Sequence, residues 1–116
     1  MKRVVATLLL FAFSAIGLVA LVWLRLLRIR RIENETGVRI VGRDELTVDI
    51  GNRRYFVFAE MSLGGPMRVV ATESVRDISD SRSIHSGVDV DSSTKAEVID
   101  RVRLYFGRRG ITVEYR

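Results

Sequence analysis

The chain has 116 residues, enough for one domain, and it contains no cysteine. Disulfides, thiolate zinc ligands and a cysteine nucleophile are therefore excluded. The net charge of +5 is unevenly spread, because residues 1–32 hold six Lys and Arg but no Asp or Glu. The rest of the chain is nearly neutral, so the excess positive charge belongs to an apolar N-terminal segment rather than to a basic globular surface.

Residues 4–24, "VVATLLLFAFSAIGLVALVWL", form an uncharged run. As a helix this run would be about 31 Å long, close to the ~30 Å hydrocarbon thickness of a bilayer. A cleaved signal peptide has a shorter apolar core followed by a small-x-small site, whereas this run ends in Val22, Trp23 and Leu24. We therefore predict an uncleaved transmembrane anchor over residues 1–32. A cleaved signal and a buried soluble helix are the alternatives.

A basic flank follows this run, and it predicts contact with membrane lipid. Tryptophan is typical of headgroup depth, and arginines are drawn to anionic headgroups. The predicted interface residues are Trp23, Arg25, Arg28, Arg30 and Arg31. The patch has no interleaved aromatics and no reading motif, so nucleic-acid binding is not expected. The four arginines outnumber the charges before the run. The positive-inside rule therefore favours a single-pass protein with a cytoplasmic C-terminal domain.

The next part of the chain reads as a short polar connector followed by strands. Residues 33–37, "ENETG", are expected to be the connector, and 38–116 to be the domain. Alternating or β-branched residues predict strands over 38–41, 45–50, 53–61 and 67–74. Gly51-Asn52 predicts a two-residue hairpin turn, because both residue types tolerate positive φ. Both faces of the 53–61 strand are mostly apolar, which favours a central position. Residues 75–92 show no period and predict a long irregular connection.

A helix and a final strand complete the pattern. Thr94 and Glu97 fit a capping box, with Ser93 as an alternative cap, and Gly107 or Gly110 is expected to end the helix. The predicted apolar stripe consists of Val98, Ile99, Val102, Tyr105 and Phe106. "ITVEY" (111–115) is expected to be the last strand. The sequence therefore predicts an α+β domain in the order β-β-β-β-α-β. One helix should pack on a mainly antiparallel sheet.

Two motifs could suggest chemistry, and neither is sufficient. "VDVDSST" (88–94) is similar to an aspartyl-phosphate motif, which needs a larger parallel sheet, and to a calcium loop, whose sixth-position glycine is replaced by Thr94. Helix capping by Asp91, Ser92 or Ser93 explains the run better. His85 is the only histidine and cannot build a usual zinc site. We expect no catalytic residues, no metal, no cofactor and no small-molecule substrate.

A binding role then leaves two places for partner contacts. Glu60 interrupts an apolar strand face, and the irregular connection carries mixed charges suited to an electrostatically steered contact. The predicted partner-binding residues are Glu60, Arg76, Asp77, Asp80, Arg82 and His85.

Three stretches also resemble a known family. They are "ELTVDIGNRRYFVFAEM", "MRVVATESV" and "TKAEVIDRVRLYFGRRGITVEYR", between Glu45 and Arg116. This pattern resembles the immunity protein 74 family of bacterial polymorphic toxin systems. The resemblance implies a small α+β protein that binds and neutralises a cognate toxin without catalysis, here held at a membrane. The alternative is a single-pass scaffold whose domain binds another envelope protein.

Overall fold

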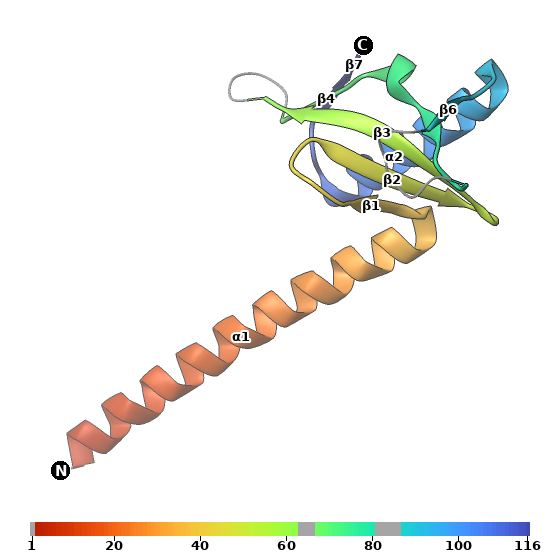
Figure 1. Ribbon diagram of the computed structural model, residues 1–116. Coiled ribbons are helices and arrows are strands. Elements are labelled where there is room, and N and C mark those ends of the chain that lie inside the picture. The colour runs from red at the N-terminus through yellow and green to blue at the C-terminus, as the bar shows by residue number, and fades with distance from the viewer. Residues whose placement is uncertain (1, 63–66, 81–86) are drawn as a thin grey trace. The chain divides into compact units, whose positions relative to one another are not determined.

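The computed structural model describes residues 2–62, 67–80 and 87–116, and the chain divides into two compact units, Met1–Arg31 and Ile32–Arg116. Helix α1 covers Lys2–Thr36, so it supplies the first unit and also the first turn of the second (Figure 1). Its apolar run 4–24 is rich in Leu and Ala and contains no proline, so the single Gly17 does not break the helix.

The second unit is built on a seven-stranded sheet with the path β1-β2-β3-β4-β7, to which β5 and β6 are attached beside β3. All neighbours are antiparallel except β4 and β7, which are parallel. The strands are β1 Val38–Ile40, β2 Glu45–Ile50, β3 Arg53–Met61, β4 Arg68–Val70, β5 Arg76–Asp77, β6 Val88–Asp89 and β7 Val113–Tyr115. The predicted α+β class is confirmed, and β3 is central as expected.

Strands β2 and β3 form the predicted hairpin, in which Ile50 pairs with Arg53 across Gly51 and Asn52. Of the two turn residues, Gly51 has positive φ (61°) and Asn52 does not. This matches a turn with glycine in its first central position. This turn fixes the register of the hairpin. Leu46, Val48 and Val57 therefore all face the side of the sheet that α2 covers.

Helix α2, Ser92–Arg109, packs on one face of the sheet (Figure 1). The five predicted stripe residues are its buried residues, as the sequence analysis expected. The Asp91 carboxylate caps the helix by accepting a hydrogen bond from the Thr94 N–H (2.8 Å), which confirms one of the predicted capping alternatives and replaces the Thr94–Glu97 box. Gly110, with φ of 68°, ends the helix in the left-handed conformation.

The core lies between α2 and the inner face of the sheet. Tyr105 and Phe106 are its largest fully buried side chains, and their rings meet edge to face at 5.3 Å between centroids. Around them are Ile32, Val38, Leu46, Val48, Tyr55, Val57, Ala59, Val70, Val75, Val98, Ile99 and Val102. The α2 stripe therefore covers the inner face of the sheet and completes one continuous core.

Two expectations for the segments between β3 and α2 were wrong. The strand expected over 67–74 ends at Val70, and Thr72–Ser74 form a 3-10 turn, η1, because the Ser74 hydroxyl and N–H both bond the Ala71 carbonyl oxygen (2.5 and 3.0 Å). The stretch 75–92 contributes two short strands, β5 and β6.

The polar connector expected over 33–37 is mainly helical. Helix α1 continues to Thr36, and Ile32 and Thr36 are buried in the second unit. The Thr36 hydroxyl donates to the Ile32 carbonyl oxygen (2.7 Å) and accepts from the Val38 N–H (3.3 Å). Polar composition suggested a linker, but the hydroxyl satisfies backbone groups at the helix end and so allows Thr36 to be buried.

Candidate protein-binding face

The face of the sheet opposite α2 is the candidate site, and we call it the outer face. Side chains alternate along a strand, so the partners of core residues point outward. The pairing places Glu45 opposite Phe58, and Glu60 opposite Val69, with Glu114 on the other side of Val69. None of these five residues belongs to the core cluster or packs against it.

Apolar side chains occupy the middle of the outer face. Phe58 is 38% exposed and Met67 is 55% exposed, while Phe56 and Val69 are half-buried. Phe56 and Phe58 come from β3, and Val69 comes from its neighbour β4. The exposed aromatic therefore lies in the middle of a sheet face and not at a frayed edge.

Acidic side chains interrupt this apolar area toward the β4 and β7 end. Glu60 and Glu114 flank Val69 on both sides, about 10 Å apart because each strand step is ~4.8 Å. Among the described residues, no Lys or Arg nitrogen lies within 4.0 Å of the Glu45 or Glu60 carboxylates. Glu114 contacts Arg116 at 3.3 Å in an exposed pair, which contributes little.

Farther from Glu60 on the outer face, two arginines are paired within the domain, whereas Arg39 of β1, which lies opposite Thr47, is exposed and has no carboxylate within 4.0 Å among the described residues. Arg54 Nε donates to Asp49 Oδ1 (2.8 Å), and Arg76 forms an ion pair with Asp89. The pKa of the Arg54 guanidinium is raised, first by its hydrogen bond to Asp49 and then by the charge of that carboxylate. The uncompensated negative charge is therefore concentrated beside Phe58 and Val69.

The predicted partner-binding residues of the connection 75–92 are placed differently from one another. Asp77 is tied into the fold: it accepts from Arg53 Nη2 (2.5 Å) and from the Ser79 hydroxyl (2.6 Å). Partial burial opposes its charge, yet the bonds from Ser79 and Arg53 outweigh this effect and lower the pKa of Asp77. Asp80 is exposed, 3.6 Å from Arg53 Nη2.

Arg76 is paired with Asp89, while Arg82 and His85 lie outside the described residues. The connection therefore does not present Arg76 and Asp77 as free charges. Of the predicted set, Glu60 is the residue that lies on the outer face.

One buried cation lies on the inner side of the sheet. Arg68 is 7% exposed and donates from Nη1 to the carbonyl oxygens of Arg43 (2.5 Å) and Ala59 (2.9 Å). Burial lowers its pKa, and in the described part of the chain no carboxylate oxygen lies within 4.0 Å of it. Its role is to link the 41–44 turn to β3.

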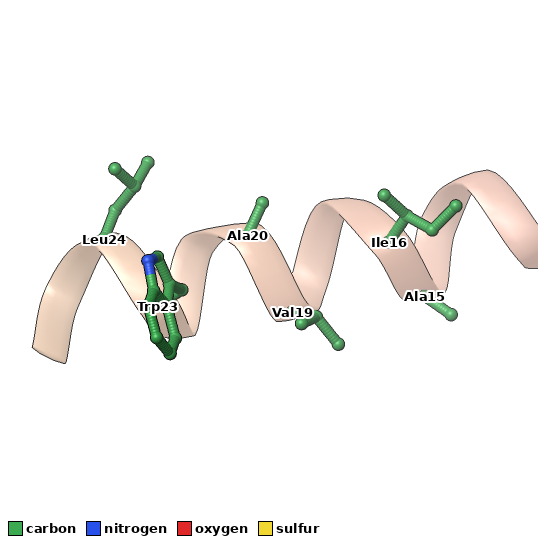
Figure 2. A pocket seen from close by; sticks show the side chains of 6 residues that line it. All are labelled: Ala15, Ile16, Val19, Ala20, Trp23 and Leu24. Atoms are coloured by element: carbon green, nitrogen blue, oxygen red, sulfur yellow. The ribbon is translucent and has the colours of Figure 1, made fainter.

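The first unit is a helix whose apolar side chains from Val4 to Leu27 are exposed. By length and composition α1 is able to cross a membrane, and its most apolar stretch is not buried. Figure 2 shows Ala15, Val19 and Trp23 in one row along this helix and Ile16, Ala20 and Leu24 in another. The predicted interface residues Trp23, Arg25, Arg28, Arg30 and Arg31 are all exposed.

Comparisons with models of known protein families, with curated proteins and with solved structures found no match for this chain. The similarity to the immunity family therefore stays a prediction. Across the described ranges 2–62, 67–80 and 87–116, no group of three or more His, Asp or Glu side chains is placed to hold a metal ion. The features that define the candidate site are thus the outer face and the apolar helix.

Sequence reasoning identified Glu60 but missed the aromatic beside it. The signal was present, because both faces of the 53–61 strand read as apolar. We interpreted this pattern as burial on both sides, whereas Phe58 remains exposed. A sheet with a single covering helix has one face left over, and the predicted one-helix architecture already implied it.

Proposed function

We propose that this chain is a membrane-anchored, non-catalytic binding protein whose C-terminal domain captures another protein on its outer face. The observation that carries the proposal is the aromatic and aliphatic centre of that face, interrupted by glutamates. Interfaces combine an apolar centre, in which aromatics are enriched, with a polar rim. A single-pass anchor adds the requirement that the partner be met at a membrane.

Within this class, we propose an immunity role, in which the captured protein is a cognate bacterial toxin. The resemblance of residues 45–116 to toxin-neutralising proteins supports this choice. Neutralisation by binding requires a shape and charge match but no reaction centre, and the exposed apolar and acidic side chains of the outer face support a role of this kind. The anchor would hold the inhibitor where a toxin enters or acts.

The proposed location is the bacterial inner membrane, with the domain in the cytoplasm. Four arginines follow the apolar run, against Lys2, Arg3 and the terminal amine before it. The excess supports a cytoplasmic C-terminal side under the positive-inside rule. Reporter fusions at each end would test this orientation. A periplasmic signal from the C-terminal fusion would contradict it.

The immunity role is tested by co-expression with the product of a neighbouring toxin-like gene. Full-length chain should protect the host, and Phe58→Ala should protect less because it removes the apolar centre of the face. Leu104→Ala is the matched control, since Leu104 is 45% exposed on α2, away from the outer face. Equal protection by both variants would contradict a role for the face, and no protection by the full-length chain would contradict immunity.

The contribution of the anchor needs its own comparison. A fragment beginning at residue 33 would lose Ile32, which is buried in the core. Two variants keep Ile32. The first replaces residues 4–24 with an unrelated membrane span and stays anchored, and the second begins at residue 28 and is soluble. If the soluble version protects as well as the anchored one, the membrane rationale is wrong.

A scaffold for an envelope complex is the second candidate, and the same uncovered face supports it. The two roles differ in what the face captures. Co-purification of a defined envelope assembly, lost in Phe58→Ala and kept in Leu104→Ala, would favour the scaffold. Toxin inhibition by the purified full-length chain would favour immunity.

A further inference from the structure

The surroundings of Phe58 and Val69 specify the chemistry of the partner. Phe58 has Glu45 directly opposite it on β2 and Glu60 two residues along its own strand. Val69 lies between Glu60 and Glu114. The exposed Phe58 and the half-buried Val69 are thus both bordered by carboxylates on the same face.

Three carboxylates at this spacing repel one another, and among the described residues the one ion pair that any of them forms is the weak Glu114–Arg116 contact. A cation placed over Val69 would lie between Glu60 and Glu114 and interact with both. An apolar side chain placed on Phe58 would cover the aromatic ring. Charge complementarity of this kind steers association and fixes register.

Resting on the proposed binding function, we propose that the outer face captures a basic protein segment that presents a Lys or Arg next to an aromatic or aliphatic side chain. The apolar side chain covers Phe58, and the basic one lies over Val69 between Glu60 and Glu114. The contact excludes water from Phe58 and Val69, and the glutamates select against acidic segments.

The test uses the full-length chain in lipid nanodiscs as bait for a displayed library of random short peptides. We expect the selected peptides to be enriched in a Lys or Arg next to an aromatic or aliphatic residue. Phe58→Ala should weaken a synthesised winner about tenfold or more, as for a central interface aromatic. Glu60→Gln and Glu114→Gln should each weaken binding of that peptide less than Phe58→Ala does. Added salt should reduce the difference in affinity between these two variants and the natural chain.

Matched controls come from α2, on the opposite side of the sheet. Leu104→Ala and Glu97→Gln remove an exposed apolar side chain and an exposed acid away from the outer face, and should leave peptide affinity unchanged. A charge exchange adds a direct readout. A winner with its basic residue changed to Glu should lose binding to the natural chain and regain it with Glu60→Lys. Thermal unfolding confirms that each variant is folded.

Several results would overturn the inference. Selected peptides that lack basic residues, or that bind equally to Phe58→Ala, would contradict the partner chemistry while leaving a binding function in place. Concentration-dependent dimerisation lost in Phe58→Ala would assign the face to a second copy of the chain instead. Failure to select any peptide would count against this inference, and with a negative co-expression result it would also reject the proposed function.

Discussion

Gly37 and Asp49 lie so close that a Cβ atom on Gly37 would be 2.2 Å from the Asp49 carbonyl oxygen. The Asp49 N–H donates to the Gly37 carbonyl oxygen at 2.8 Å, and the Gly37 N–H donates to the Glu33 carbonyl oxygen at 2.8 Å. Gly37 therefore closes α1 and starts the pairing of β1 with β2. Its φ of 76° is in the left-handed region that favours glycine.

Gly37→Ala should destabilise the domain by more than about 2 kcal/mol, because left-handed strain is combined with a backbone clash. Gly51→Ala is the control: Gly51 also has positive φ, but its Cβ would meet nothing within 4 Å. That variant should lose only about 1 kcal/mol. Urea unfolding in mild detergent measures both. Equal losses would mean that the contact with Asp49 is unimportant.

Gly107→Ala should stabilise the domain by about 0.5–1 kcal/mol, because glycine inside a helix costs that much relative to alanine. Gly107 is exposed in α2, and an added Cβ would meet nothing within 4 Å. Gly110→Ala should instead destabilise, since Gly110 adopts φ of 68° at the helix end. Thermal unfolding separates the two. A loss of stability in Gly107→Ala would contradict the predicted solvent-facing position.

Arg68→Met should cost about 2 kcal/mol, because it removes the donors to the Arg43 and Ala59 carbonyl oxygens while keeping an apolar stem. Arg43→Met is the control, since it removes an exposed guanidinium and keeps the carbonyl acceptor. Hydrogen exchange should show faster exchange at Ala59 and Met61, whose N–H groups bond Asp44 in the same turn. Unchanged exchange there would contradict the linking role of Arg68.

Asp77→Asn should reduce stability at neutral pH but have little effect in acid. The pKa of Asp77 is lowered in the folded domain, so the stabilisation is present above the unfolded value of about 3.9 and is lost as pH falls through the folded pKa. Urea midpoints measured from pH 7 to about pH 2 should therefore converge. Asp80→Asn, at an exposed position, should show the same dependence of the urea midpoint on pH as the natural chain. If the urea midpoints of Asp77→Asn and of the natural chain differed by the same amount at every pH, the stabilising role of the Asp77 charge would be refuted.

Phe13→Arg should impair membrane insertion, because an arginine at the centre of a span costs about 2.5–3.5 kcal/mol. Leu26→Arg should have little effect, since Leu26 lies among the arginines of the basic flank. Carbonate extraction of membranes distinguishes integral from peripheral chain. If both variants remain integral to the same extent, residues 4–24 are not the span.

Much of the fold could be predicted where one local pattern decides the structure. The α2 stripe follows from helical spacing, and Gly51-Asn52 specifies the hairpin without help from the rest of the chain. The candidate site was harder, because Glu60 was recognised by its charge while the exposure of Phe58 depends on which face α2 covers. That choice is made by tertiary packing and not by the strand itself.

The errors share a cause: a side chain satisfied the backbone in a way that residue type alone does not reveal. Thr36 and Ser74 both bond nearby carbonyl oxygens, and this allows a helix to continue in one place and a strand to stop in the other. The sequence left the cap open between Asp91, Ser92, Ser93 and Thr94, because capping acceptors occur at adjacent positions, and the structure assigns it to Asp91.

The parallel pairing of β4 with β7 affects the order of events during synthesis. Arg68 pairs with Val113, so the sheet cannot close until the segment after α2 has left the ribosome. By then the apolar helix has long been available to the insertion machinery. With α1 inserted as proposed, the domain would complete its fold at the membrane, and until β7 is made the strand edge of β4 that it pairs with is open to other chains.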